Sequence, residues 1–183
     1  SEPVKINEDV YAQPQKFVTV KGSTNEEIIE KIKGNAQQII NTFKQSDINE
    51  TQNRFTKSLN KETALKEKLG ISLSMPSIYK VVKQENNFIW IERQISKGTM
   101  NIIAYEMPLN SIPADSLAKV EAIIKMRDSI GEKYIPGREP ETMWMITEKA
   151  YAPYVFDAKI AGQNAIETKG MWEVKNFYMA GPF

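Results

Sequence analysis

Phe88-Ile-Trp-Ile-Glu-Arg-Gln94 is the stretch that decides the fold, because its aromatic and β-branched side chains favour a β-strand. Met100-Asn-Ile-Ile-Ala-Tyr-Glu-Met107 is a second run of this kind, and Lys97-Gly98 between the two runs is a turn signal. Strand-forming runs joined by so short a turn pair with each other in opposite directions. The sequence therefore predicts an antiparallel hairpin over residues 88–107.

An amphipathic helical segment is predicted before this hairpin. Ser23 or Thr24 can cap its first turn, and Gly70 suits its end. The polar stretch 47–53 is expected to break the segment into two helices, with the helical pattern resuming over residues 55–69. Apolar residues three and four apart trace one helical face in its first part: Ile28, Ile29, Ile32, Ala36, Ile39, Ile40 and Phe43.

A second amphipathic helix is predicted from about Ser116 to Gly131. Residues 1–14 are expected to be an extended lead-in, and shorter strands are predicted at residues 16–21, 79–82, 142–147, 158–169 (two arms around Gly162) and 171–175. The order strand, helix, strand, strand, helix, strand matches a ferredoxin-like split βαβ plan. We therefore expect a single α+β domain over residues 1–183, with an antiparallel sheet, two helical segments and extra C-terminal hairpins.

Composition narrows the chemistry that the chain can perform. Lys and Arg number 24 against 23 Asp and Glu, so the basic excess of a typical nucleic-acid-binding protein is missing. The sequence contains no Cys and no His, which removes thiolate nucleophiles, imidazole acid–base catalysis and the commonest transition-metal ligands. We predict no cofactor, no metal site and no nucleic-acid partner. No apolar run approaches the about 20 residues of a membrane-spanning helix.

One group of candidate binding residues lies at the end of the second helix and in the Pro-Gly loop after it: Arg127, Asp128, Lys133, Tyr134 and Arg138. The planar guanidinium groups of Arg127 and Arg138 suit an anionic or sugar ligand. The alternative interpretation is local, because basic side chains also stabilise the C-terminal end of a helix and Asp128 can pair with them.

A second group is aromatic: Tyr151, Tyr154, Phe156, Trp172, Phe177 and Tyr178. Such side chains can stack against a sugar ring or an apolar peptide, and Tyr151-Ala-Pro-Tyr154 falls in a predicted loop, where ligand contacts are common. The alternative is packing within the sheet, since Trp172 and Val174 alternate onto one face of a strand. From the two groups we select Arg127, Asp128, Tyr134, Arg138, Tyr151, Tyr154 and Trp172 as candidate ligand-binding residues.

A pair of carboxylates is the remaining candidate for chemistry. Glu148 with Glu167 or Glu173 could hydrolyse a glycosidic bond if the two groups faced each other across a cleft. The alternative is that these side chains are solvated on exposed strand faces, where Glu is common. No residue is assigned a catalytic role.

Several stretches together resemble a family of uncharacterised Bacteroidetes lipoproteins classed as a domain of unknown function. They are Lys125-Met-Arg-Asp-Ser-Ile-Gly-Glu-Lys-Tyr-Ile-Pro-Gly137, Met145-Ile-Thr-Glu-Lys-Ala-Tyr-Ala-Pro-Tyr154, Glu167-Thr-Lys-Gly-Met-Trp-Glu-Val-Lys175, Met179-Ala-Gly-Pro-Phe183, Asp9-Val-Tyr-Ala-Gln-Pro14 and Gly70-Ile-Ser-Leu-Ser-Met-Pro76. The resemblance implies a cell-envelope location and export as a lipoprotein, and assigns no activity. It also implies that the chain is a trimmed portion of a longer lipoprotein, so any membrane contact is expected only through a lipid anchor that this chain lacks.

These observations favour a non-enzymatic binding or assembly module of the cell envelope, with an envelope protein or a glycan as its partner. The alternative is a carboxylate-dependent hydrolase that acts on glycan or cell-wall material. A third interpretation is a structural fragment that needs further segments to function.

Overall fold

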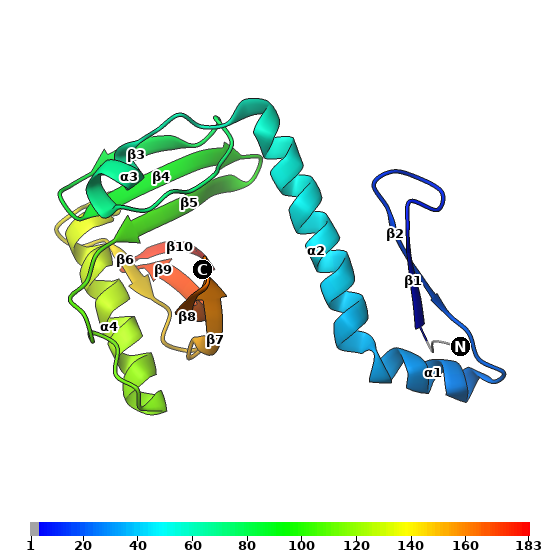
Figure 1. Cartoon of the computed structure of the whole chain (residues 1–183). Coiled ribbons are helices and arrows are strands. Elements are labelled where there is room, and N and C mark those ends of the chain that lie inside the picture. Colours follow the sequence, from blue (N-terminus) through cyan, green and yellow to red (C-terminus); the bar gives the residue numbers. More distant parts are fainter. Residues whose placement is uncertain (1–3) are drawn as a thin grey trace. The chain divides into compact units, whose positions relative to one another are not determined.

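The computed structural model describes residues 4–183, and contacts within the chain divide it into two compact units, Ser1–Glu106 and Met107–Phe183. Both contain helices and antiparallel strands, which confirms the α+β class (Figure 1). The prediction of one domain over residues 1–183 stays a prediction, since compactness of two parts does not show whether each folds alone. No helix of the described chain is long and apolar enough to cross a membrane.

The first unit begins with a strand pair that we expected only in part. β2 (Lys16–Val20) lies at the predicted position, and β1 (Val4–Glu8) pairs with it antiparallel from Val4 opposite Val20 to Glu8 opposite Lys16. Residues 4–8 are extended as predicted, but their pairing with β2 was not predicted, while residues 1–3 lie outside the described chain. Pairing satisfies the backbone hydrogen bonds of this segment, which an isolated extended chain would leave to water.

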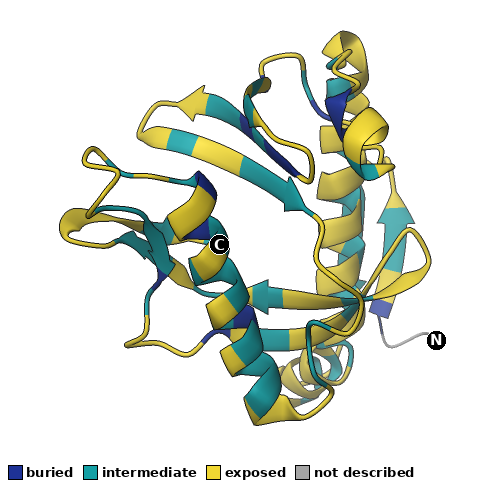
Figure 2. Cartoon of the chain, turned by 90° about the vertical axis from the view of Figure 1, so that its left-hand side faces the viewer, coloured by how far each residue is buried: buried dark blue, intermediate teal, exposed yellow. Residues whose placement is uncertain are grey.

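The first helical segment consists of α1 (Asn25–Gly34) and α2 (Ala36–Phe55). The hydroxyl of Thr24 accepts a hydrogen bond from the amide of Glu27, as the predicted cap requires. The break falls at Asn35, whose side chain donates to the carbonyl of Lys31 at 2.8 Å, and the predicted break at residues 47–53 is wrong. Polar side chains there stay helical because they point to solvent, and within residues 25–55 none is buried (Figure 2).

The predicted hairpin is confirmed and forms the core of the first unit. β4 (Phe88–Ile95) pairs with β5 (Gly98–Tyr105) and also with β3 (Lys80–Gln84), in the order β3-β4-β5. The short 3₁₀ turn η1 (Thr56–Ser58) leads toward α3 (Ala64–Leu69), which ends at the predicted Gly70 in a left-handed conformation, φ 66°. The core residues of α3, β4 and the intervening segment are Ala64, Leu65, Met75, Tyr79, Ile89 and Ile91.

The second unit places one long helix, α4 (Ser116–Tyr134), beside a three-stranded antiparallel sheet. The sheet order is β10 (Phe177–Pro182), β9 (Met171–Val174), β6 (Met145–Thr147). β7 (Tyr154–Ile160) and β8 (Gln163–Lys169) form a separate two-stranded ribbon. The ribbon is the predicted hairpin around Gly162, although its first strand begins at Tyr154 within the predicted loop, and β9 is the predicted strand at residues 171–175 (Figure 1). The strand β10 was not predicted.

The prediction that the second helix ends at Gly131 is wrong, because α4 continues to Tyr134. Gly131 is buried, and a Cβ atom there would lie 1.8 Å from the carbonyl oxygen of Met145. The glycine thus permits a close approach of helix and strand, which is a use that helix-terminating signals in a sequence do not reveal.

The ferredoxin-like detail is not confirmed. That plan would join residues 16–21, 88–94, 100–107 and 142–147 in one sheet. In the described chain β2 pairs with β1, β4 with β3 and β5, and β6 with β9. The predicted elements exist, but pairing partners depend on tertiary contacts that alternation of side chains does not encode.

Candidate functional site

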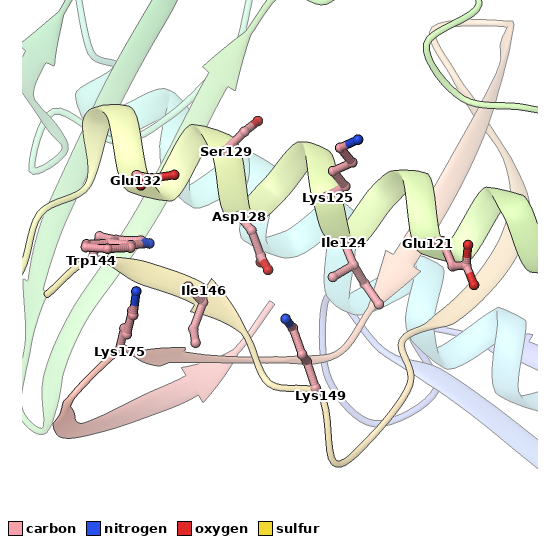
Figure 3. Close-up of a pocket in the computed structure, with 10 residues that line it drawn as sticks. All are labelled: Glu121, Ile124, Lys125, Asp128, Ser129, Glu132, Trp144, Ile146, Lys149 and Lys175. Carbon is pink, nitrogen blue, oxygen red and sulfur yellow. The ribbon is translucent and has the colours of Figure 1, made fainter. Parts of the chain in front are cut away.

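A groove of about 820 Å³ lies in the second unit between α4 and β6 (Figure 3). One wall comes from α4, and the other comes from β6 and the segments next to it. The lining residues are Glu121, Ile124, Lys125, Asp128, Ser129, Glu132, Trp144, Ile146, Lys149 and Lys175. All belong to residues 107–183, so the groove is a feature of one compact unit.

Backbone contacts hold the two walls of the groove in place. The amide of Thr147 donates to a carboxylate oxygen of Asp128 at 2.7 Å, and the amide of Met145 donates to the carbonyl of Ile135 at 3.0 Å. Gly131 allows the helix to approach the carbonyl of Met145. These contacts cover the outer edge of β6 with α4, so this edge does not offer its backbone groups to another strand.

The helix wall presents a stripe of side chains three and four positions apart, the spacing that lines one face of a helix. Glu121, Asp128 and Glu132 are acidic, Lys125 is basic, and Ile124 is apolar. Asp128 already accepts the hydrogen bond from Thr147. In Figure 3 Lys125 points away from the strand wall, so the helix wall is mainly acidic.

The strand wall is apolar and basic. Trp144 and Ile146 come from β6 and the residue before it, and Lys149 and Lys175 add two ammonium groups. The Nζ atom of Lys175 lies 3.9 Å from the centroid of the Trp144 ring, a cation–π arrangement that fixes both side chains.

The two walls face each other with opposite charge, yet no ion pair joins them among the described residues. Figure 3 shows Asp128 and Lys149 pointing toward one another across the groove. Among residues 4–183, no group of three or more acidic side chains is arranged to hold a metal ion. The groove can therefore offer one ligand an acidic helix wall, a basic strand wall and an apolar floor, which is formed by Ile124, Trp144 and Ile146.

Of the seven selected candidate residues, Asp128 lines this groove. Arg127, its neighbour, stacks instead on the last residue of the chain, with its guanidinium carbon 3.4 Å from the ring centroid of Phe183. Phe183 also exchanges two backbone hydrogen bonds with Gly170, at 2.9 and 3.2 Å. Arg127 is therefore placed as a structural contact that holds the end of the chain.

Tyr134 is buried, with 6% of its surface exposed, and the Nζ atom of Lys133 lies 4.8 Å from its ring centroid. Arg138 is exposed in the loop after α4. Trp172 is half-buried over Gly181, where a Cβ atom would come within 2.9 Å of the indole. The structure does not bring these residues together with Asp128 in the groove.

Tyr151 and Tyr154 are exposed by 72% and 71%. Tyr151 lies in the loop before β7, and Tyr154 is the first residue of that strand. Tyr154 lies beside Phe156, with the two rings nearly parallel at 17° and their centroids 6.5 Å apart. Tyr154 and Phe156 thus form an exposed aromatic pair, and neither they nor Tyr151 line the groove.

Of the two predicted carboxylate pairs, Glu148 with Glu167 or with Glu173, the structure brings Glu148 and Glu173 together. Ile146 and Glu173 are directly opposite in the β6–β9 pairing, which puts Glu148 and Glu173 diagonally on one sheet face. Burial raises the pKa of Glu173, and a hydrogen bond and repulsion from Glu148 raise it further. The amide of Ala150 is the main cause that lowers the pKa of Glu148. Glu167 lies elsewhere, on β8, paired with Lys169 at 2.9 Å.

Sequence analysis missed the strand wall of the groove, namely Trp144, Ile146, Lys149 and Lys175. The three-and-four spacing of Glu121, Lys125, Asp128 and Glu132 was a signal for the helix wall. No local signal marks the strand wall, because Lys175 joins it only through pairing of β9 with β6.

The fold and the groove define an α+β protein whose second unit carries a groove with one mainly acidic and one basic wall. The chain belongs to the family described as domain of unknown function DUF4837, whose model matches residues 58–183. A second domain of unknown function, DUF8532, matches residues 1–56, so the two matches meet near η1. Neither a curated protein nor a solved structure matches the chain. The predicted membership of an uncharacterised family is confirmed, and its Bacteroidetes and lipoprotein aspects stay predictions.

Proposed function

We propose that this protein is a non-enzymatic binding or assembly module of the cell envelope, and that the groove between α4 and β6 receives a segment of a protein partner. The observation that carries this proposal is the opposition of an acidic helix wall and a basic strand wall over Ile124, Trp144 and Ile146. A peptide segment with apolar side chains and charges of both signs complements all three parts of the groove.

The chemistry of the residues supports binding rather than turnover. Without His or Cys, the groove contains no imidazole or thiolate that could activate a nucleophile. Its apolar floor can instead remove apolar ligand surface from water, which favours association. The envelope location rests on the resemblance described above.

Synthetic seven-residue peptides test the groove. One peptide alternates Lys, Val and Glu, a second carries only Lys and Val, and a third carries only Glu and Val. We expect the mixed peptide to shift the indole N–H signal of Trp144 in two-dimensional NMR spectra, while Trp90 and Trp172 serve as internal references. Absence of any Trp144 shift with all three peptides would overturn the proposal.

A charge-reversal variant distinguishes binding of the peptide in the groove from unspecific electrostatic attraction to the protein surface. Lys149→Glu removes a lysine of the strand wall, and Lys159→Glu makes the same change of net charge at an exposed position on β7. Because an exposed ion pair contributes about 0.2–1 kcal/mol, we expect Lys149→Glu to weaken binding of the mixed peptide by about 1.5- to fivefold. Equal effects of the two variants would contradict the assignment of the groove.

The alternative function, a carboxylate-dependent hydrolase acting on glycan or cell-wall material, is favoured by one observation. Glu173 has a raised pKa and shares a hydrogen bond with Glu148, as expected when two carboxyl groups share one proton. Both side chains lie outside the residues that line the groove. Release of reducing ends from peptidoglycan or chitin oligosaccharides that disappears in Glu148→Gln and Glu173→Gln would support the hydrolase. Unchanged turnover in both variants, or no turnover in the wild-type protein, would exclude it.

A further inference from the structure

The β7–β8 ribbon carries an exposed aromatic surface that the groove does not use. Tyr154 and Phe156 are two residues apart on β7, so both point to the same face of the ribbon. Tyr154 is 71% exposed and Phe156 is 46% exposed. Their rings are nearly parallel, and the 6.5 Å between the centroids is close to the about 6.8 Å that two residues span along a strand.

Polar side chains accompany the two rings on the same face. Lys169 is directly opposite Tyr154 in the register, and Glu167 is directly opposite Phe156. The Nζ atom of Lys169 lies 2.9 Å from a carboxylate oxygen of Glu167 and 5.4 Å from the ring centroid of Phe156. A donor and an acceptor of hydrogen bonds are therefore held beside the aromatic rings.

We infer that this ribbon face is a carbohydrate-binding surface, on which Tyr154 and Phe156 stack against sugar rings while Lys169 and Glu167 hydrogen-bond the hydroxyl groups. The face of an aromatic ring carries negative partial charge, and the C–H groups on one side of a pyranose ring carry positive partial charge. Sugar hydroxyls both donate and accept, so they match a neighbouring ammonium and carboxylate pair without the need for a ligand charge.

The charges of the ribbon distinguish this ligand from others. Asp157 and Glu167 balance Lys159 and Lys169 along the two strands, so the ribbon lacks the basic excess that draws a protein to an anionic lipid surface. A purely apolar peptide would cover Lys169 and Glu167 without replacing their contacts with water, which is unfavourable. A neutral, hydroxyl-rich polysaccharide needs no basic excess on the protein, and its hydroxyl groups can replace the contacts of Lys169 and Glu167 with water.

The test uses soluble polysaccharides as probes in affinity electrophoresis of the full chain: hydroxyethyl cellulose as a soluble β-1,4-glucan, partially acetylated chitosan, α-mannan and dextran. We expect at least one to retard the wild-type protein. Tyr154→Ala and Phe156→Ala should each weaken that interaction by about two- to tenfold, which corresponds to about 0.5–1.4 kcal/mol and to the strength of a stacked aromatic contact. Tyr154→Phe should keep most of the binding because it retains the ring.

Lys159→Ala is the matched control, because it changes an exposed side chain on the opposite face of the same strand and should bind as the wild-type protein does. Circular dichroism and a thermal melt check that each variant is folded. Lys149→Glu, which tests the groove, should leave glycan binding unchanged, so the two sites can fail separately. Binding to phosphatidylglycerol vesicles in place of any glycan, no retardation by any probe, or equal losses in Tyr154→Ala and Lys159→Ala would overturn the inference.

Discussion

Gly131 is the position where one added methyl group should disturb the second unit most. The Cβ atom of an alanine there would lie 1.8 Å from the carbonyl oxygen of Met145, 2.8 Å from its carbonyl carbon and 3.2 Å from its methyl group. Normal separation of carbon and oxygen is about 3.3 Å. Helix α4 and strand β6 must therefore move apart by more than about 1 Å, and the obstacle is backbone that cannot rotate away.

The cost of Gly131→Ala follows from three contributions. Overpacking of this kind costs about 1–3 kcal/mol. Separation of the walls also weakens the hydrogen bond from Thr147 to the charged Asp128, and such bonds contribute about 1.5–3 kcal/mol. Replacement of glycine by alanine inside a helix stabilises that helix by about 0.5–1 kcal/mol, which offsets part of the loss. We expect a net loss of about 2–4 kcal/mol in the free energy of unfolding.

Urea denaturation followed by circular dichroism measures this loss, and a thermal melt should show a Tm lower by about 4–15 °C. Gly34→Ala is the matched control, because Gly34 is also helical and an added Cβ atom there meets nothing within 4 Å. That variant should be equal to the wild-type protein or more stable by up to about 1 kcal/mol. A Gly131→Ala protein as stable as Gly34→Ala would refute the contact between α4 and β6, and with it the geometry of the groove.

Two further variants test other contacts of the second unit. Because the pKa of Glu173 is raised in the folded protein, the folded state loses stability as pH rises above the ordinary value of 4.5, so Glu173→Gln should melt above the wild-type protein at pH 7 and approach it near pH 4. A difference in Tm that is the same at both pH values would argue against repulsion from Glu148. Arg127→Ala should cost about 0.5–2 kcal/mol through loss of its stacking on Phe183, whereas Arg138→Ala, at an exposed position, should stay within about 0.5 kcal/mol of the wild-type protein. Equal melting temperatures of the two arginine variants would remove the structural role of Arg127.

Local patterns predicted the elements that depend on nearby residues. Strand-forming side chains predicted the hairpin of β4 and β5, and a capping hydroxyl predicted the start of α1 at Thr24. A glycine that can adopt the left-handed conformation predicted the end of α3 at Gly70. The extension of α4 past Gly131 was missed because Gly131 serves a contact with Met145 that forms only in the folded chain. The break at Asn35 was also missed, although its hydrogen bond to the carbonyl of Lys31 is local.

The candidate site residues were likewise predicted from the sequence only in part. Asp128 was selected from the sequence and lines the groove, but Arg127 next to it points to Phe183 instead. One position along a helix turns a side chain by about 100°, so neighbours in a cluster face different surroundings. Tyr154 was selected as an aromatic ligand contact, and only the ribbon register shows Lys169 opposite it.

By itself the sequence determined the α+β class, most element positions, and the absence of thiol and imidazole chemistry. These properties depend on composition and on the repeat of side chains along one segment. Tertiary structure alone decided how strands pair outside the predicted hairpins, that an acidic and a basic wall face each other, and that Glu148 meets Glu173. Each of these depends on bringing together residues that are distant in the chain, and the packing that does so has no signature within any one segment.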